Sequence, residues 1–370
     1  MEKCLHILPM GKLSGAEKMV LLMCKNIESY KPVVICGGEE LKKFFNKNGI
    51  ESYYENFSNK NLIEIVKFLK DIIEKDKIKI IHAHDNKASI FAYITKKFFS
   101  LDSITIISHV HSCYPFIQKK GFNKLVDSIF RKKYDCSILC GNFVFDFYKE
   151  NTKYFKNCKS YVVPNCIDVE NIINKKNPDN IINLRNKFKI PKDKKILGFV
   201  GRLCDIKGIV PFIEHLSLVK ENFSDCKFLL IGDGDQYLYI KNLIKSLKCE
   251  DLFILTGFQE NVYDFYPLID IVFLPSRYEG LPMFLLEAMA FGKAIVSMNV
   301  GSINQIIQDG ENGYLIPKDN FEEFIKKIEY LKKDEFLISE MGKKSFDIVK
   351  REYNLNNYVK EITDIYNSLL

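Results

Sequence analysis

The chain has 370 residues, 47% of them hydrophobic, which is enough for two or three globular domains with cores of their own. The net charge of +7 suits a phosphate-bearing ligand or an anionic membrane surface, and it is too small and too dispersed to indicate nucleic acid. Eleven cysteines without a Cys-x-x-Cys pair, no secretory signal and no long apolar run exclude a disulfide scaffold, a zinc site and a membrane span, and predict a cytoplasmic protein.

The first half of the chain alternates short apolar runs with helical patterns. Strands are predicted at 5–9, 32–36, 78–83, 104–110, 136–139 and 161–163, and helices at 16–27, 39–48, 61–75 and 87–99. Apolar runs separated by helices of about ten or more residues indicate a parallel sheet with right-handed crossovers.

The pattern breaks in a polar stretch and then restarts, so we place a linker at Pro164–Asn177. The second half has predicted strands at 196–201, 228–231, 252–255, 271–274, 294–297 and 314–316, and helices at 210–220, 237–247 and from residues 320, 335 and 354. We therefore expect two doubly wound α/β domains, residues 1–168 and 169–354, with ligand sites at their strand ends on either side of a cleft. Residues 355–370 are expected to pack back on the first domain as a helix.

Two glutamates, Glu279 and Glu287, follow the predicted strand 271–274. The first lies in a turn, and the second lies in a helix that Pro282 can begin. A helix N-terminus beside a strand end, with an acid on either side, suits an anionic ligand rich in hydroxyl groups, such as a nucleotide sugar. The alternative is a buried strand–turn–helix with two solvated glutamates.

Two cations follow the glycine that ends the predicted strand 196–201. Arg202 can hold a diphosphate through two parallel hydrogen bonds, and Lys207 adds a point charge. Two solvated surface cations are the alternative. The earlier loop Gly11–Glu17 also joins a strand to a helix, and it fits either a phosphate near Gly15 or a tight turn without a ligand.

Two groups of residues raise the question of a metal. Asp233 and Asp235 lie in a glycine turn after a strand, where aspartate is favoured for its local hydrogen bonds, so we reject a magnesium site there. The pairs His82/His84 and His109/His111 each end an apolar strand, where alternate residues share a face. Four histidines could hold an ion, but no carboxylate or thiol spacing supports one, and we expect a ligand-binding role for His111 alone.

The segment Lys119–Lys133 has six basic residues and one acidic residue. Its apolar residues recur at helical spacing, namely Phe122, Leu125, Val126, Ile129 and Phe130. Such a basic amphipathic helix is typical of a protein that lies on anionic lipid. A helix that covers the sheet with a solvated basic face is the alternative.

Together these motifs resemble the retaining glycosyltransferases of family 4, which have the GT-B fold, over nearly the whole chain. The resemblance rests on the order and spacing of Ser14-Gly-Ala-Glu17, Ile81-His-Ala-His84, Ser108-His-Val-His111, Val163-Pro-Asn-Cys-Ile-Asp168, Val200-Gly-Arg202 to Lys207-Gly208, Gly232-Asp-Gly234, Thr256-Gly-Phe258, Pro275-Ser276, Glu279/Glu287 and Gly310-Glu-Asn-Gly313. The chain departs from the family at Cys166, where glycine is usual, and at Asn304-Gln305, where Pro-Glu is common, so Gln305 receives no role.

The resemblance implies roles for particular residues. Arg202 and Lys207 would hold the donor diphosphate, and Glu287 would bind the ribose hydroxyls. Glu279 and His111 would be the catalytic residues, at the donor sugar and near its anomeric carbon. The rest of the implied donor site consists of Gly15, Gly280, Leu281 and Met283, the last three through the backbone amides of residues 280–283.

The implied reaction is the metal-independent transfer, with retention, of a hexose or N-acetylhexosamine from a nucleotide-diphosphate sugar, expected to be a UDP-sugar, without a cofactor. The acceptor would be a glycan or a lipid-linked molecule in bacterial surface polysaccharide or lipopolysaccharide synthesis. The enzyme would then be cytoplasmic, with Lys119–Lys133 on the inner face of the cell membrane. A non-catalytic partner of the same fold and a sugar-nucleotide epimerase are the alternatives.

Overall fold

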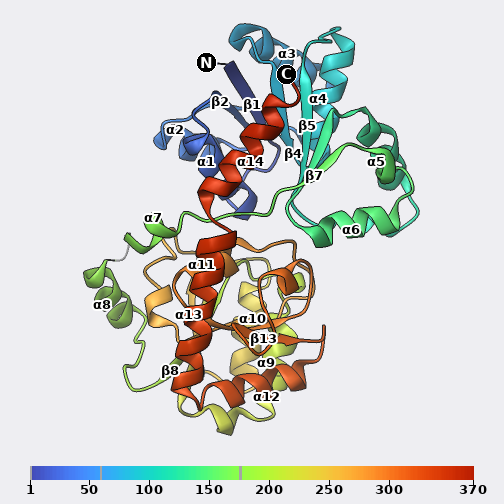
Figure 1. Cartoon of the computed structure of the whole chain (residues 1–370). Coiled ribbons are helices and arrows are strands. Elements are labelled where there is room, and N and C mark those ends of the chain that lie inside the picture. The colour runs from blue at the N-terminus through green and yellow to red at the C-terminus, as the bar shows by residue number, and fades with distance from the viewer. Residues whose placement is uncertain (1, 59–60, 175–176) are drawn as a thin grey trace. The chain divides into compact units, whose positions relative to one another are not determined.

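The computed structural model describes residues 2–58, 61–174 and 177–370 (Figure 1). The chain divides into two compact units, the first formed by the residues up to Cys166 together with Leu355–Leu370, and the second by Ile167–Asn354. Each unit is an α/β structure around a parallel sheet, as predicted. Residues 175–176 of the predicted linker lie outside the described residues.

The first unit has a sheet whose described strands follow the order β3-β2-β1-β4-β5-β6-β7, and every pair is parallel. The strands are β1 (Glu2–Leu8), β2 (Tyr30–Cys36), β3 (Glu51–Tyr54), β4 (Ile80–His84), β5 (Thr105–Val110), β6 (Cys136–Leu139) and β7 (Ser160–Val162). The helices are α1 (Gly15–Asn26), α2 (Glu39–Lys47), α3 (Leu62–Asp76), α4 (Asn86–Phe98), α5 (Phe122–Phe130), α6 (Asn142–Asn151) and α14 (Leu355–Asn367). The C-terminal helix α14 lies against α1 and over β1 (Figure 1).

The second unit repeats this plan with the strand order β10-β9-β8-β11-β12-β13, again with parallel pairs. The strands are β8 (Lys195–Val200), β9 (Cys226–Ile231), β10 (Phe253–Gly257), β11 (Ile271–Leu274), β12 (Ala294–Met298) and β13 (Gly313–Ile316). The helices are α7 (Val169–Asn174), α8 (Pro178–Lys187), α9 (Ile209–Ser217), α10 (Tyr237–Ser246), α11 (Met283–Ala290), α12 (Phe321–Leu331) and α13 (Glu335–Glu352).

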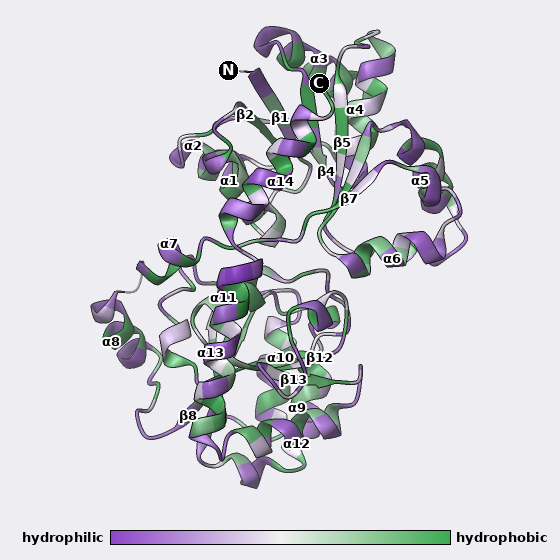
Figure 2. Ribbon diagram, viewed as in Figure 1, coloured by the Kyte–Doolittle hydropathy of each residue, from purple (hydrophilic) through white to green (hydrophobic). Residues whose placement is uncertain are grey.

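The strands are the apolar part of both units, and Figure 2 shows them mostly in green, whereas the helices alternate between green and purple. Strands covered on both faces by helices are expected to be apolar along their whole length. The burial of β4, β11 and β12 fits this, because every residue of these strands is buried.

Four helices and strands were not predicted. The helix α7 lies inside the predicted linker, and its residues Val169 and Ile172 are buried. The edge strand β3 is short and its residues are mostly half-buried, and α6 carries apolar and polar residues without a clear break at its ends. The helix α8 lies in the polar stretch read as a break, and none of its residues is buried. It begins at Pro178, and the Asn177 side chain caps it by accepting from the Asp179 amide at 3.0 Å. The sequence therefore contained the signals for a helix start but no apolar stripe to mark the helix itself.

The strand orders place a topological switch point at the same position in each sheet. In the first unit, β1 is followed by strands that extend the sheet on one side, and β4 by strands that extend it on the other. In the second unit, β8 and β11 have the same relationship. In open α/β sheets ligands bind outside the carboxyl ends of the strands at such a point. The loops after β1, β4, β8 and β11 are therefore where functional side chains are expected.

Candidate active site

The loops that follow β8 and β11 bring Lys207 and Glu279 into direct contact. Lys207 ends a short 3-10 turn, Asp205–Lys207, and its Nζ donates to Glu279 Oε1 at 2.6 Å. Only 15% of the lysine side chain and 8% of the glutamate side chain are exposed. A pair with so little water around it is held firmly in place, because either partner left alone would be a poorly solvated charge.

Arg202, the other predicted diphosphate ligand, follows the same strand as Lys207 but is far more accessible. Its side chain is 70% exposed, and Nη2 lies 3.6 Å from Asp235 Oδ1. The neighbouring Asp233 accepts from the amide of Gly234 at 2.7 Å, as expected of an aspartate in a glycine turn. Asp233 thus has a partner within its own loop, whereas Asp235 lies beside Arg202, whose side chain stays largely exposed and can turn toward a ligand.

Close backbone packing fixes these loops. A Cβ atom on Gly208 would lie 2.1 Å from the Pro275 carbonyl oxygen, and one on Gly301 would lie 2.2 Å from the Glu279 carbonyl oxygen. Both glycines also have positive φ, at 67° and 62°, which other residues rarely adopt. The turns that carry Lys207 and Glu279 therefore depend on glycine in neighbouring segments.

The helix α11 begins at Met283 with Pro282 as its N-cap, as predicted. The first N–H groups of a helix have no partner within it and carry partial positive charge, so they can bind an anion. The predicted donor residues Gly280 and Leu281 lie in the turn just before this helix, and Ser302 N donates to Gly280 O at 2.9 Å. The side chains of Leu281 and Met283 are buried, which leaves their backbone as the part that can meet a ligand.

Glu287 lies in α11 and is only 2% exposed. The Tyr266 hydroxyl lies 2.9 Å from Glu287 Oε2 and donates to it, and burial, together with this carboxylate, raises the pKa of Tyr266. A hydrogen bond from a buried hydroxyl holds the carboxylate in one orientation. Its role toward a ribose stays a prediction.

In the first unit, Gly15 begins α1 after the loop that follows β1. Ser14 is the N-cap, and Glu17 Oε2 accepts from the Ser14 amide at 2.8 Å and from its hydroxyl at 2.5 Å. The sequence Ser-x-x-Glu is a capping box, which stabilises the first turn of a helix. This finding explains the spacing of Ser14 and Glu17 structurally, and the role of Gly15 toward a ligand stays a prediction.

Five histidines cluster on one face of the first sheet. The register pairs His6 with His82 and His84 with His109, and alternate residues of a strand share a face, so the cluster consists of His6, His82, His84, His109 and His111. Four of them are at most 2% exposed, and only His111, which follows β5, is partly exposed. His6 was missed, although it alternates with apolar residues in β1 in the same way as the others.

The cluster offers two groups of three ring nitrogens within 4.8 Å of one another, His6/His82/His84 and His84/His109/His111. Their ring planes do not suit a metal ion. His82 stacks on His84 with centroids 4.5 Å apart and planes 20° apart, and His109 stacks on His111 at 4.1 Å and 21°. The lone pair of an imidazole lies in the ring plane, so stacked rings cannot both direct one at a single ion.

Asp85, directly after β4, is a residue that the sequence interpretation missed. Its φ of 89° and ψ of 174° belong to a region that is almost restricted to glycine, and such strain is concentrated at functional sites. Its side chain accepts from the Ala88 amide at 3.0 Å and so caps α4, and burial raises its pKa to about 6. The sequence did contain a signal for Asp85, because an aspartate directly after a strand at a switch point is well placed to meet a ligand.

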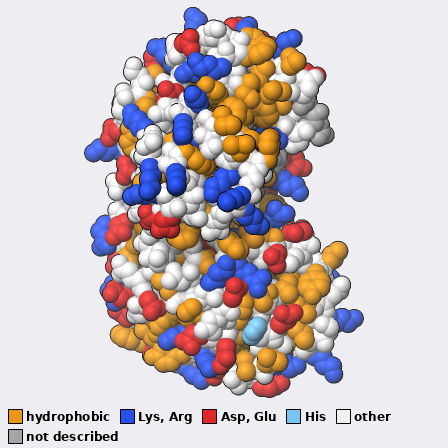
Figure 3. Space-filling view, turned by 90° about the vertical axis from the view of Figure 1, so that its right-hand side faces the viewer, with side chains coloured by type: hydrophobic (Ala, Val, Ile, Leu, Met, Phe, Trp, Pro, Cys, Tyr) orange, Lys and Arg blue, Asp and Glu red, His pale blue; other side chains and the backbone are white. Residues whose placement is uncertain are grey.

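The basic segment differs from its prediction at one residue, Arg131. Arg131 is buried, and its Nη2 and Nε donate to Asp127 Oδ1 at 2.7 and 2.9 Å, so this cation belongs to the interior and not to a solvated face. Lys119, Lys120, Lys132 and Lys133 are exposed, as are three apolar side chains of α5, with exposed fractions of 77% for Phe122, 57% for Leu125 and 53% for Ile129. Figure 3 shows hydrophobic and basic side chains next to one another on this side of the first unit. We call these seven residues the α5 surface.

Two family models match the chain. Glycosyltransferase Family 4 matches residues 13–171, and Glycosyl transferases group 1 matches residues 180–347. The two matched segments correspond to the two units and together leave only short stretches unmatched.

Curated relatives are glycosyltransferases. An uncharacterized glycosyltransferase of Haemophilus influenzae is 31% identical over 52% of this chain and 54% of its own length. The UDP-Gal:alpha-D-GlcNAc-diphosphoundecaprenol alpha-1,3-galactosyltransferase of Escherichia coli is 23% identical over 98% of this chain and 96% of its own length. For the first three relatives, the match spans about half of their length.

Solved structures share the fold over the whole chain. The Anabaena protein HepE in complex with UDP and glucose has a TM-score of 0.87 at 18% identity, with 100% of both chains covered. A glycosyltransferase from Rickettsia africae has a TM-score of 0.84 at 21% identity, with 100% of this chain and 98% of that chain covered. The predicted fold, two Rossmann-like domains of the GT-B class, is confirmed.

Proposed function

Because the chain belongs to glycosyltransferase family 4, with the group 1 glycosyl transferase domain in its second unit, we propose that it moves a hexose or N-acetylhexosamine from a nucleotide-diphosphate sugar to an acceptor hydroxyl. The observation that carries this proposal is the contact between Lys207 and Glu279 at the switch point of the second sheet, with Arg202 exposed beside it. A cation, a carboxylate and the start of α11 meet there, and these are the groups that a diphosphate and a sugar require.

The difficult step in such a reaction is the departure of a nucleoside diphosphate, whose negative charge grows as the glycosidic bond breaks. Preorganised cations and amide dipoles lower the energy of that charge. We assign this task to Lys207, to Arg202 and to the first turn of α11, without a divalent ion. The acceptor hydroxyl then attacks on the face that the diphosphate leaves, which retains the anomeric configuration.

The donor in this proposal is a UDP-sugar, and the acceptor is a glycan or a lipid-linked molecule in bacterial surface polysaccharide or lipopolysaccharide synthesis. The structure of HepE supports the choice of a UDP-sugar as donor, because HepE was solved with UDP and glucose. Two relatives support the proposed acceptor: one is named a galactosyltransferase acting on a diphosphoundecaprenol, and the other a lipopolysaccharide N-acetylglucosaminetransferase of Salmonella typhimurium.

The α5 surface supports a location at an anionic membrane. Four exposed lysines lie around three exposed apolar side chains of one helix, which is the composition that an interfacial helix needs. No helix of the described part of the chain combines the length and the apolar character that crossing a bilayer requires. A lipid-linked acceptor would be reached from such a surface.

A screen of UDP-, GDP- and ADP-sugars by thermal unfolding tests the donor, because a ligand at 100 times its dissociation constant stabilises by about 2.7 kcal/mol. A product assay with the donor that binds then separates the classes of function. Transfer to an acceptor with the configuration of the donor, observed by NMR, supports the proposal. Binding of no nucleotide would favour a non-catalytic partner, and altered sugar released without an acceptor would favour an epimerase.

A further inference from the structure

Three of the clustered histidines form a hydrogen-bonded chain that crosses the first sheet. His6 Nδ1 lies 3.1 Å from His84 Nε2, and His84 Nδ1 lies 3.0 Å from His111 Nε2. Neighbouring ring centroids are 5.5 and 5.3 Å apart, with planes within 25° of each other. The rings therefore meet nitrogen to nitrogen, from β1 through β4 to the residue after β5.

A second chain lies against the first. The Tyr366 hydroxyl of α14 lies 2.6 Å from His82 Nδ1, and His82 Nε2 lies 3.1 Å from His109 Nδ1. The stacked pairs His82/His84 and His109/His111 join the two chains face to face. His111 belongs to the first chain through its hydrogen bond and touches the second only by stacking, which allows the two to be tested separately.

All five rings are neutral at physiological pH. Burial lowers the pKa of His6 to about 3 and that of His111 to about 4, and it lowers the pKa of the other three well below the usual range. A neutral imidazole has one N–H donor and one lone pair. Each hydrogen bond in the chain therefore has a direction, and one direction must hold along the whole chain from His6 to His111.

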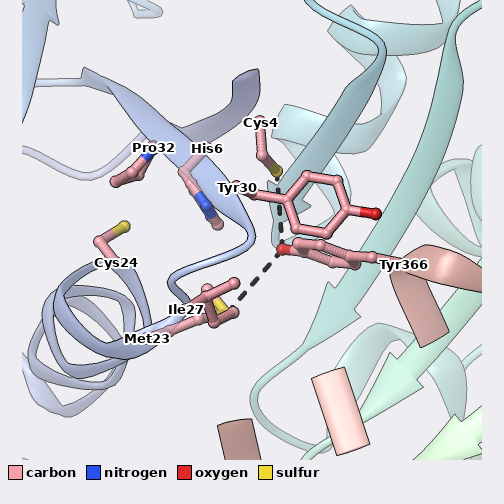
Figure 4. A pocket seen from close by; sticks show the side chains of 8 residues that line it. All are labelled: Cys4, His6, Met23, Cys24, Ile27, Tyr30, Pro32 and Tyr366. Atoms are coloured by element: carbon pink, nitrogen blue, oxygen red, sulfur yellow. Dashed lines mark hydrogen bonds between the residues drawn. The ribbon is translucent and has the colours of Figure 1, made fainter. Parts of the chain in front are cut away.

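The two ends of the chain differ. At one end, His111 Nδ1 is a buried atom without a hydrogen-bond partner among the described residues. At the other end, His6 lines a small, partly open cavity of about 10 Å³ together with Cys4, Cys24, Tyr30 and Tyr366 (Figure 4). That volume is close to what one water molecule requires.

These ends decide the direction. If His111 carried its proton on Nδ1, that N–H would be a buried donor without an acceptor, and orphaned buried N–H groups are rarer in folded proteins than buried acceptors that lack a donor. In the opposite direction, His111 Nε2 donates to His84 Nδ1, and His84 Nε2 donates to His6 Nδ1. The last proton, on His6 Nε2, then faces the cavity, where a water can accept it.

We propose that His84 is a positioning residue for His111: it fixes the imidazole plane and the tautomer in which Nε2 carries the proton, so that Nδ1 is a bare acceptor for a substrate hydroxyl. This inference rests on the proposed function, in which His111 meets the sugar or the acceptor. Nδ1 is shielded from water in the ligand-free chain, and a hydroxyl that reaches it finds an acceptor without a competing partner. The role that a carboxylate has beside many catalytic histidines is here taken by a second imidazole.

The tautomer of His111 is measured directly by ¹⁵N NMR of histidine-labelled protein at neutral pH. We expect a protonated Nε2 and an unprotonated Nδ1 in the wild type, and the loss of this preference in His84→Phe. This measurement needs no substrate, so it distinguishes a failure of the inference from a failure of the proposed function. A protonated Nδ1 on His111 in the wild type would overturn the inference.

Kinetics with the donor and acceptor found by the screen provide the second readout. His84→Phe should lower kcat about tenfold or more without a comparable change in the KM for the donor, because it removes orientation and not binding. His84→Asn, whose side-chain oxygen can stand near the place of Nδ1, should recover most of the loss. Tyr366→Phe is the matched control, since it removes the polar end of the second chain and should leave kcat unchanged. Wild-type kcat in His84→Phe would overturn the inference.

Discussion

Lys207 Nζ lies 2.6 Å from Glu279 Oε1, so the cation assigned to the donor diphosphate is paired with a carboxylate before any ligand arrives. The two residues are 72 positions apart in the chain, and both are largely buried. Donor binding would exchange one anionic partner of Lys207 for another. The pair thus holds both side chains in defined positions at the site.

The pairing makes an unusual prediction for Glu279→Gln. Removing the competing carboxylate should tighten the binding of UDP, by about 1 kcal/mol or roughly fivefold, and should lower the rate of sugar transfer. Isothermal calorimetry and a product assay measure the two effects. Glu311→Gln, at an exposed glutamate of the same unit, is the control and should change neither. Weaker UDP binding in Glu279→Gln would show that the carboxylate assists the phosphate instead of competing with it.

Lys207→Ala and Arg202→Ala should each reduce transfer by about 100-fold or more, because removing one preorganised donor to a developing charge costs about 3 kcal/mol. Arg202→Ala should leave the melting temperature unchanged, since this side chain is 70% exposed. Lys207→Ala leaves Glu279 buried without its partner, so the double variant with Glu279→Gln controls for stability. Steady-state kinetics at saturating donor decides the matter, and wild-type turnover in either single variant would contradict the proposed role.

The histidine cluster should make the first unit sensitive to acid. Its pKa values are lowered in the folded chain, so the unfolded chain binds more protons between pH 6.5 and about 4, and stability is lost as the pH falls through this window. Each such histidine contributes about 1.4 kcal/mol per pH unit there. Asp85, whose pKa is raised to about 6, instead adds stability as the pH falls, but it is one group and the histidines are five.

Denaturant unfolding at pH 7.5, 6.5 and 5.5, followed by a probe in the first unit, tests this expectation. The free energy of unfolding should fall steeply below pH 6.5, and the fall should be smaller in His82→Phe, which has one histidine fewer to protonate. A free energy that stays level down to pH 5 would mean that the rings are not kept neutral.

Arg131, the residue directly after α5, is buried and pairs with Asp127 of that helix. Arg131→Ala should cost about 3–5 kcal/mol of stability, because it leaves the buried Asp127 carboxylate without its cation. Lys132→Gln, at the next position, is exposed and should cost almost nothing. Thermal unfolding of the two variants checks the contrast, and equal melting temperatures would contradict the burial of Arg131.

The α5 surface predicts binding to anionic vesicles. Replacing Phe122, Leu125 and Ile129 by serine should weaken sedimentation with phosphatidylglycerol vesicles about tenfold or more, as should replacing the four exposed lysines by glutamine. Phe336→Ser is the control, because Phe336 is 76% exposed in the second unit. Unchanged sedimentation of both α5 variants would remove the membrane from the account.

Much of the fold could be predicted, because apolar runs such as Ile271–Leu274 read as buried strands and the intervening periodicity reads as helices. The helix α8 could not be predicted in this way, since it buries no side chain and so lacks an apolar stripe. The prediction that Arg131 belongs to the exposed basic face was wrong. The spacing of Asp127 and Arg131, four residues apart across the end of α5, was the signal that these two side chains would pair.

The sequence indicated which residues belong to the site, but it did not indicate how their side chains contact one another. Lys207 and Glu279 were each recognised by their place after a strand, yet their ion pair depends on how two loops pack through Gly208 and Gly301. The histidine cluster depends on the register of neighbouring strands and on a contact from α14 to His82, and no short motif contains that information. The strained backbone of Asp85 is likewise a property of the folded turn.

The central claim is that Arg202, Lys207 and the start of α11 hold the donor diphosphate without a divalent ion. Calorimetric titration of UDP into the wild type and into Lys207→Ala, each with and without EDTA, tests it most directly. The account predicts binding to the wild type that EDTA does not change and binding at least tenfold weaker in the variant. Wild-type binding that disappears with EDTA, or equal affinity in Lys207→Ala, would contradict it.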